Sequence, residues 1–285
     1  MKAAEFAYER ADDLGRALTR LAELKGRARL LAGGQSLVPT LNLRLQAPEI
    51  ILDISRIKDL RGISVAGPAI RIGALTRHND ILTSDLMAIS CPLLHKAAGH
   101  IGHPAIRNRG TIGGSLALGD PAAELPACVV ALDATIVAAS AGGERRIPAR
   151  SFYTGIFSNV LDAAEMIVAV EIPFLKAEER DGFLELSRRE GDYSMIGLAA
   201  RGAASGGVFS ALSLAYFAAG DKPILAQKAA AALTGKAATD TAAVDAAVAA
   251  LASDLPDFAD LQADVAVRRH LAGVLLRRIL PQLVG

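Results

Sequence analysis

The sequence predicts an α+β fold in two domains. The chain has 285 residues, which is long enough for two domains. Segments with the apolar pattern of strands alternate with segments of helical spacing along its whole length. A charged stretch, KAEERD at residues 176–181, follows a strong strand-like segment and is typical of a linker. We therefore predict a first domain over residues 1–175 and a second over residues 176–285.

The first domain is expected to open with alternating helices and strands. Apolar residues recur at helical spacing over residues 14–25, and Gly26 stands where such a helix would end. A short buried strand at 29–31 and a short helix at 39–45 precede residues 49–54, which are typical of a buried parallel edge strand. This unit lacks the GxGxxG spacing of a Rossmann dinucleotide site, so a site of that design is not predicted.

Further elements follow in the same domain. They are a β-hairpin at 62–73, helix-capping residues at 76–81, a helix at 91–99, a helix or strand at 127–137 that runs into β structure, a hairpin at 142–143 leading to a strand at 145–147, a loop at 151–157 and a strand at 165–173. The last strand ends in Ile172 and Pro173, which is typical of an edge strand or of the exit from a domain.

The second domain is expected to contain a small sheet and then helices. Strands are predicted at 182–187, 197–201 and 209–217, and helices at 223–234, 242–252 and 265–284. The last helix carries arginines on one side and leucines on the other.

Charge and hydropathy exclude several classes of protein. Lys and Arg number 31 and Asp and Glu 30, so the chain lacks the basic excess of a general nucleic-acid binder. It has no apolar run of about eighteen residues, and no membrane span is predicted. Its first residues are acidic where a signal peptide is apolar, and we expect a cytoplasmic protein. Hydrophobic residues make up 52 %, which fits either an alanine-rich core or a large surface buried against partner subunits.

Residues that often carry catalysis or bind metals do not form a convincing group. Cys91 and Cys128 are too few for an iron–sulfur cluster or a structural zinc, and we expect buried thiols in a reducing compartment. His100 and His103 lie three apart, but Pro104 breaks the helical spacing of a metal pair. Ser36 and Ser115 do not lie in a G-x-S-x-G motif. We predict no catalytic residue and no metal ligand in this chain.

Two short glycine motifs are the strongest functional signal. The first is AGGQSLVP at 32–39, and the second lies within IGHPAIRNRGTIGGSLALGDPAAELP at 101–126. Glycine allows positive φ and a close approach of the backbone to a ligand. Successive N–H groups in such turns form concave sites for phosphate oxygens. We predict that both Gly-Gly turns bind the diphosphate of one extended cofactor.

Asp120 and Glu124 follow the second motif and allow two interpretations. Asp120 is either the cap of a solvated helix with Pro121 at its first position, or one of the two acids accepts hydrogen bonds from cofactor hydroxyls. The residues alone favour neither.

These motifs carry a resemblance to a known family. AGGQSLVP at 32–39, IRNRGTIGGSLALGDPAAELP at 106–126, SRREGDYSMIGLAA at 187–200 and RRHLAGVLLRR at 268–278 resemble the FAD-binding medium subunit of molybdenum hydroxylases, the carbon-monoxide-dehydrogenase and xanthine-dehydrogenase family. The resemblance covers the whole length in the right order. It implies a two-lobed FAD-binding domain of the vanillyl-alcohol-oxidase (PCMH) type, followed by a small α+β C-terminal domain.

The resemblance also implies non-covalent FAD and a set of residues that bind it. The two glycine motifs would place backbone amides on the diphosphate. Glu124, before Leu125 and Pro126, matches the family's acid toward the ribityl or neighbouring hydroxyls, with Asp120 as the nearby alternative. Leu161 matches an apolar residue near the adenine or flavin ring, and Tyr193 an aromatic residue close to the isoalloxazine. The predicted cofactor-binding set is Ala32, Gly33, Gly34, Gln35, Ser36, Leu37, Ile101, Thr111, Ile112, Gly113, Gly114, Ser115, Asp120, Glu124, Leu161 and Tyr193.

The sequence departs from the family pattern at two places. Ser115 stands where relatives often carry Asp or Asn, and residues 185–187 lack a lysine that many relatives carry near the flavin.

The implied function is electron transfer within a larger complex. A large partner subunit would hold the molybdopterin cofactor, a small partner subunit would hold 2Fe-2S clusters, and the complex would be a dimer of heterotrimers. Substrate specificity would lie in the large partner subunit, and the exposed flavin edge of this chain would serve a quinone, a cytochrome, oxygen or a nicotinamide cofactor as the external acceptor. Two alternatives are a free-standing flavin oxidase of a small organic substrate and a non-enzymatic nucleotide-binding scaffold.

Overall fold

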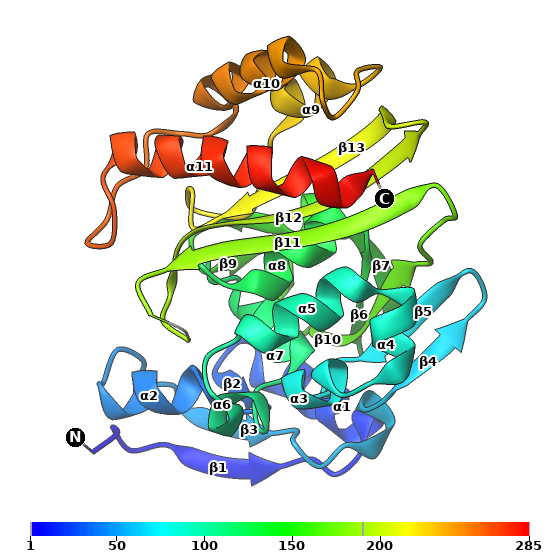
Figure 1. Cartoon of the computed structure of the whole chain (residues 1–285). Helices are drawn as coiled ribbons and strands as arrows, with labels where there is room; N and C mark the ends of the chain where they lie inside the picture. Colours follow the sequence, from blue (N-terminus) through cyan, green and yellow to red (C-terminus); the bar gives the residue numbers. More distant parts are fainter. Residues whose placement is uncertain (1, 190, 285) are drawn as a thin grey trace.

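The computed structural model describes residues 2–189 and 191–284. Its elements form successive layers (Figure 1): a small parallel sheet, a five-stranded sheet, a group of short helices, a four-stranded sheet and a final layer of helices. Helices and strands alternate in the first part and segregate in the second, so the predicted two-part α+β fold is confirmed.

The first layer is a parallel sheet with the order β1-β3-β2. Its elements are β1 (Ala7–Arg10), α1 (Leu14–Leu24), β2 (Ala28–Leu31), α2 (Leu37–Asn42) and β3 (Ile50–Asp53). The Asp13 carboxylate begins α1 by accepting the N–H of Arg16 at 2.8 Å. The expectation that the third of these strands is an edge was wrong, because Ala7 pairs with Ile50 on its other side.

The second layer is an antiparallel sheet with the order β4-β5-β10-β6-β7. Its strands are β4 (Ile63–Ala66), β5 (Ala69–Gly73), β6 (Thr135–Ser140), β7 (Gly143–Pro148) and β10 (Met166–Pro173). β10 is central and almost entirely buried, so it is not an edge strand. Pro173 pairs with Ala69 at the last register position, where the chain leaves this sheet.

Short helices cover one face of the five-stranded sheet. They are α3 (His78–Leu82), α4 (Asp85–Ser90), α5 (Pro92–His100), α6 (Pro104–Arg107), α7 (Ile112–Leu118) and α8 (Glu124–Ala131). Where a loop was expected at 151–157, the chain forms a two-stranded ribbon of β8 (Tyr153–Gly155) and β9 (Ser158–Asn159). The 3-10 helices are η1 (Lys58–Leu60), η2 (Ala149–Ser151) and η3 (Leu280–Leu283).

The second part forms an antiparallel sheet and three helices. These are β11 (Glu179–Ser187), β12 (Ser194–Ser205), β13 (Val208–Phe217), β14 (Ile224–Leu225), α9 (Gln227–Leu233), α10 (Thr241–Asp254) and α11 (Val265–Ile279). The stretch expected as a linker at 176–181 already belongs to β11 from Glu179 onward. The last residue of that stretch is Asp181, whose side chain is fully buried in an ion pair with Arg201 on β12, 2.7 Å away. The expected helix over 265–284 stops at Ile279, and Pro281 follows in η3.

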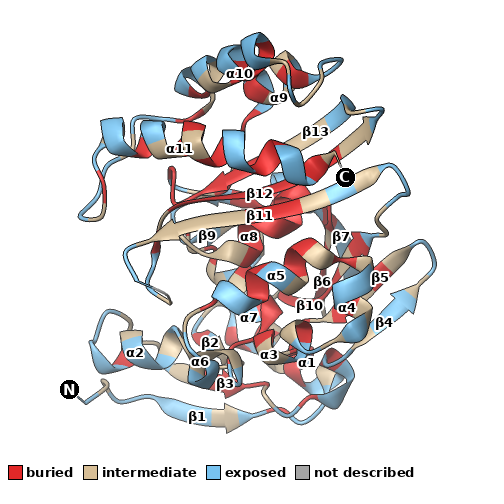
Figure 2. Ribbon diagram, viewed as in Figure 1, coloured by how far each residue is buried: buried red, intermediate tan, exposed pale blue. Residues whose placement is uncertain are grey.

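The two parts share a hydrophobic core. Phe183 and Phe217 of the four-stranded sheet stack with ring centroids 5.7 Å apart and belong to the same apolar cluster as the inner faces of α5 and α8. The opposite face of this sheet packs against α9, α10 and α11. Figure 2 shows buried residues on both sides of the four-stranded sheet, toward α5 and α8 and toward the C-terminal helices. The loops that connect these strands and helices are therefore anchored at both ends by packed elements.

Candidate cofactor site

A groove opens at the end of the small parallel sheet. Its volume is about 360 Å³. The lining residues are Leu31, Ala32, Gly33, Gly34, Gln35, Val38, Pro39, Asp53, Ser55 and Arg109. The carboxyl ends of parallel strands meet at one edge, and β2 and β3 both end here. The first predicted motif therefore forms one wall of a real groove.

The backbone of the first motif offers a row of unused donors. Among the described residues, none accepts a hydrogen bond from the N–H groups of residues 33–37. Gly34 has a φ of +75°, which glycine adopts without strain. Val38 N–H returns to the carbonyl of Gly34 at 3.0 Å and closes the turn into α2. Five consecutive amides, of which those of residues 33–35 lie at the groove wall, suit an anion such as a diphosphate.

The second motif is built differently from what its glycine pair predicts. Gly113 and Gly114 do not form a turn: they lie in the first turn of α7, which Thr111 caps by accepting the Gly114 N–H at 3.2 Å. Gly113 is needed for packing, since a β-carbon there would be 2.6 Å from the β-carbon of Ala74.

The amides of the second motif already have acceptors within the protein. Ile112 N–H donates to the Thr76 carbonyl at 3.0 Å, and Gly113 N–H donates to the Ala74 carbonyl at 2.8 Å. Ser115 N–H donates to the Thr111 carbonyl at 3.0 Å. The described residues leave the Thr111 N–H and the Ser115 hydroxyl without a partner. The two motifs therefore do not supply equal numbers of donors to a ligand.

The two motifs nevertheless meet. A β-carbon on Gly33 would be 2.2 Å from the Arg109 carbonyl oxygen and 2.8 Å from the Gly110 Cα. Arg109 also lines the groove beside the first motif. The absence of a side chain at position 33 thus lets the two loops close on one another.

A second group of predicted residues gathers at the other end of α7. α8 begins at Glu124 with Ala123 as its cap, so the interpretation of Asp120 as the helix cap was wrong. Asp120 instead closes a short turn by accepting the Ala122 N–H at 2.9 Å. Burial raises the pKa of Asp120 and raises that of Glu124 to about 8, with the charges of Glu185 and Asp120 also raising the latter.

Tyr193 completes this group. It precedes β12 and is mostly exposed. Partial burial and then the negative charges of Asp120 and Glu124 raise its pKa. The structure therefore brings together Asp120, Glu124 and Tyr193, which are up to 73 positions apart in the sequence.

Three further predicted residues lie outside this group. Leu161 donates its N–H to Asn159, whose side-chain amide donates to the Ala117 carbonyl of α7 at 2.8 Å. Ile101 ends α5, and its carbonyl accepts from Arg107 at 3.0 Å. Leu37 begins α2 beside the open amides.

The sequence interpretation missed residues at the groove and residues near Glu124. Asp53 and Ser55 line the groove, and the Asp53 carboxylate is held by the Tyr8 hydroxyl at 2.6 Å. The end of β3 at the same sheet edge as β2 is a signal for them. Glu185 has no such signal. Its side chain is 4 % exposed, and His100 Nδ1 lies 3.9 Å away. One of its oxygens has no hydrogen-bond partner among the residues that the structure describes. Burial raises the pKa of Glu185 to about 7.

The residues present fit FAD. Open amides and Arg109 suit the diphosphate, and hydrogen-bonding acids beside an aromatic ring suit ribityl hydroxyls and a flavin. Within residues 2–189 and 191–284, no three His, Cys, Asp or Glu side chains are grouped as a metal site requires. In the same ranges, no helix is long and apolar enough to cross a bilayer.

Comparison with known proteins decides the family. Residues 4–175 match the family model described as the FAD binding domain in molybdopterin dehydrogenase. Residues 182–283 match the CO dehydrogenase flavoprotein C-terminal domain. This chain belongs to the FAD-binding medium subunits of the molybdenum hydroxylase family. The resemblance seen in the sequence is confirmed, and the chain carries an FAD-binding domain.

Relatives of this medium subunit are components of dehydrogenases. It is 46 % identical over 199 residues to the 6-hydroxypseudooxynicotine dehydrogenase complex subunit alpha of Paenarthrobacter nicotinovorans, covering 70 % of this chain and 67 % of that one. It is 36 % identical to the glyceraldehyde dehydrogenase medium chain of Sulfolobus acidocaldarius, over 95 % of both chains. A solved carbon monoxide dehydrogenase of Hydrogenophaga pseudoflava superposes with a TM-score of 0.95 at 36 % identity, over 99 % of this chain and 98 % of that one.

Proposed function

We propose that this chain is the flavin subunit of a three-chain molybdenum hydroxylase. It receives electrons from 2Fe-2S clusters of a small partner chain and delivers them to an external acceptor, while substrate is oxidised at a molybdopterin centre in a large partner chain. Bound FAD supplies the redox chemistry. Support comes from the family of the chain and from the names of its relatives, which are medium chains or lettered subunits of dehydrogenases.

We propose that the predicted set of residues holds FAD in two sections. The amides of residues 33–37 and the Thr111 N–H donate to the diphosphate, and the Ser115 hydroxyl and Arg109 lie beside it. Glu124 and Asp120 accept hydrogen bonds from the ribityl or neighbouring hydroxyls, and Tyr193 lies against the isoalloxazine. Leu161 and Ile101 contribute apolar surface. The observation that carries the proposal is the row of five unused amides at residues 33–37, beside a groove that the first motif and Arg109 line.

We propose a heterotrimer that forms a dimer and works in the cytoplasm. The two cysteines support a reducing compartment, since both are free and buried. The medium-chain names of the relatives support the three-chain organisation.

Purification from the native host tests this function. A tagged chain is expected to bring down a large and a small chain, with molybdenum and iron present in proportion to FAD. In that complex, substrate should reduce the flavin, whereas the isolated chain loaded with FAD should stay oxidised with the same substrate. Reduction of the isolated chain by substrate would instead identify a free-standing oxidase. A chain that binds ADP but not FAD would identify a nucleotide-binding scaffold.

A further inference from the structure

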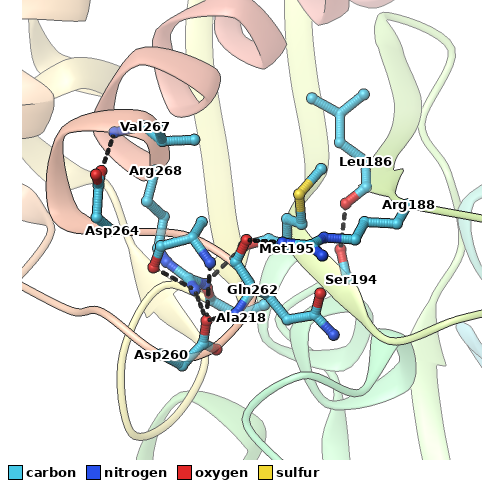
Figure 3. A network of polar contacts seen from close by, with 11 residues as sticks. Leu186, Arg188, Ser194, Met195, Ala218, Asp260, Gln262, Asp264, Val267 and Arg268 are labelled. Atoms are coloured by element: carbon cyan, nitrogen blue, oxygen red, sulfur yellow. Dashed lines mark hydrogen bonds and ion pairs between the residues drawn. The ribbon is translucent and has the colours of Figure 1, made fainter.

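A buried arginine of the last helix is connected by hydrogen bonds to the backbone next to Asp120, Glu124 and Tyr193. Arg268 is on α11, and its side chain is only 4 % exposed. None of the predicted cofactor residues is on this helix. The bonds of Arg268, shown in Figure 3, lead to two segments that adjoin this group.

The guanidinium joins the ends of two neighbouring strands. One terminal nitrogen, Nη1, donates to the carbonyls of Met195 and Ala218, the first at 2.6 Å. Met195 is near the start of β12 and Ala218 directly follows β13. These strands are antiparallel neighbours, so the two carbonyls lie at the same end of the sheet.

The second terminal nitrogen fixes the arginine itself. Nη2 donates to the Asp260 carboxylate at 2.6 Å and to the Ala263 carbonyl at 3.4 Å. The guanidinium carbon lies 4.7 Å from the centroid of the Phe258 ring. A planar, forked donor group is required to reach acceptors on both sides at once, and a lysine ammonium does not provide it.

One carbonyl held by Arg268 lies in a segment that carries a predicted flavin-site residue, and the other lies in a segment hydrogen-bonded to the loop that carries two more. Met195 is two residues after Tyr193. Ala218 donates its N–H to the carbonyl of Pro121 at 2.8 Å, and Pro121 lies between Asp120 and Glu124.

Ala218 is also held in a strained conformation. Its φ is +52°, a region that side chains other than glycine rarely adopt. Hydrogen bonds on both sides of this residue, from Arg268 and to Pro121, hold it there. Strain of this kind persists where surrounding contacts fix it, often near functional sites.

We propose that Arg268 is a positioning residue for the flavin half of the cofactor site. By holding the Met195 and Ala218 carbonyls, it sets the distance between Tyr193 and the acids Asp120 and Glu124. This inference rests on the proposed function. The bonds of Arg268 reach none of the residues that line the groove of the first motif, and α11 lies far from β2, α2 and β3 in Figure 1.

Binding of FAD and of ADP distinguishes an effect on the flavin half of the site from a general effect on the chain. ADP carries the diphosphate that the first motif binds but lacks the ribityl and flavin groups. We expect Arg268→Lys to bind FAD about tenfold more weakly, the effect of losing one or two hydrogen bonds, and to bind ADP as the original chain does. The visible circular dichroism of the bound flavin should also change. The matched control is Arg269→Lys, since Arg269 is the next residue on α11 and pairs with Asp257 at the surface; it should alter neither ligand nor spectrum.

Other results would overturn the inference. Unchanged FAD affinity and an unchanged flavin spectrum in Arg268→Lys would do so, and so would an equal weakening of FAD and ADP. If Arg268→Lys does not fold, Asp260→Asn decides, because it removes the charged acceptor that fixes Nη2 and so loosens the hold of Nη1 on the two carbonyls. Weaker FAD binding with unchanged ADP binding then supports the inference, and unchanged FAD binding overturns it. An original chain that binds neither ligand would overturn the proposed function itself.

Discussion

Gly33 lies against the Arg109 carbonyl so closely that a β-carbon at position 33 would be 2.2 Å from that oxygen. This contact joins the loop that carries the open amides to the loop that precedes α7. It makes the distance between the two motifs depend on the absence of one side chain.

Gly33→Ala should therefore weaken FAD binding. The new methyl group meets backbone atoms, which cannot rotate away as a side chain can. Overpacking of this kind typically costs about 1–3 kcal/mol, which corresponds to roughly 5- to 150-fold in affinity. Titration of the purified chain with FAD, followed by flavin fluorescence, measures the effect.

The control for this variant is Gly15→Ala. Gly15 is in α1, where an added β-carbon has only an ordinary contact, 3.5 Å from Asp13. Alanine favours the helix, so the control should be as stable as the original chain or more stable and should bind FAD equally well. Equal FAD affinity in Gly33→Ala and Gly15→Ala would refute the role given to position 33.

Glu124 should make the stability of the flavin-free chain depend on pH. Burial holds its pKa at about 8, above the ordinary value of 4.5, so between these values the folded chain binds a proton that the unfolded chain has released. Stability is then fully present below about pH 4.5 and falls as pH rises toward 8. Glu124→Gln removes this loss, and its Tm should exceed that of the original chain by a margin that grows from pH 5 to pH 8.

Thermal unfolding across this pH range provides the test. Asp85→Asn is the control, because Asp85 also lies in the first turn of a helix but is exposed. A Tm difference for Glu124→Gln that is constant from pH 5 to pH 8 would contradict the buried, protonated state of Glu124.

The ion pair of Asp181 and Arg201 should be important for stability. Arg201 donates two hydrogen bonds to the carboxylate, at 2.7 and 3.1 Å, and the Asp181 side chain is fully buried. Asp181→Asn leaves Arg201 with only the Glu179 carboxylate, 3.9 Å away, to balance its charge. Breaking a buried pair typically costs about 3–5 kcal/mol, so we expect a loss of unfolding free energy toward the lower end of that range. Urea unfolding measures the loss.

An exposed pair supplies the comparison. Asp257 pairs with Arg269 at the surface with 70 % of its side chain exposed. Asp257→Asn should change the unfolding free energy little. Similar losses in both variants would show that burial does not distinguish the two pairs.

The two cysteines should be unreactive in the folded chain. Both are fully buried, and burial raises the pKa of Cys91 to about 12 and that of Cys128 well above its usual range. Only the thiolate reacts, so a disulfide reagent should label neither cysteine until denaturant is added, and then both. Ala88→Cys, at an exposed position of α4, should react at once under native conditions. Rapid labelling of Cys91 or Cys128 in the folded chain would be inconsistent with this packing.

Much of the fold follows from local sequence patterns. The periodicity of residues 14–25 and the glycine after them predict α1 to within a residue at its end, and the hairpin of β4 and β5 follows from alternation around a Gly-Pro turn. The position of a strand within its sheet does not follow from such patterns. β3 and β10 are central because partners from distant parts of the chain pair on both sides, and a single segment carries no record of those partners.

The site was predicted only in part, because contacts between distant parts of the chain are not visible in a single segment. Glycine pairs and the family motifs identify the loops, but they do not show that Gly113 packs on Ala74 within a helix or that its N–H is already used. Glu185 and Arg268 reach the site region only through tertiary packing. Asp181 lies in a charged stretch typical of a linker, yet its partner on β12 makes it part of the core.

The central claim is that the open amides beside Gly33 bind the diphosphate of FAD while Tyr193 and the acids on the far side of α7 bind its flavin half. A crystal structure of the chain with FAD tests it most directly. We expect diphosphate oxygens at about 3 Å from the N–H groups of residues 33–37, with the isoalloxazine against Tyr193. A diphosphate bound away from these amides would contradict the account.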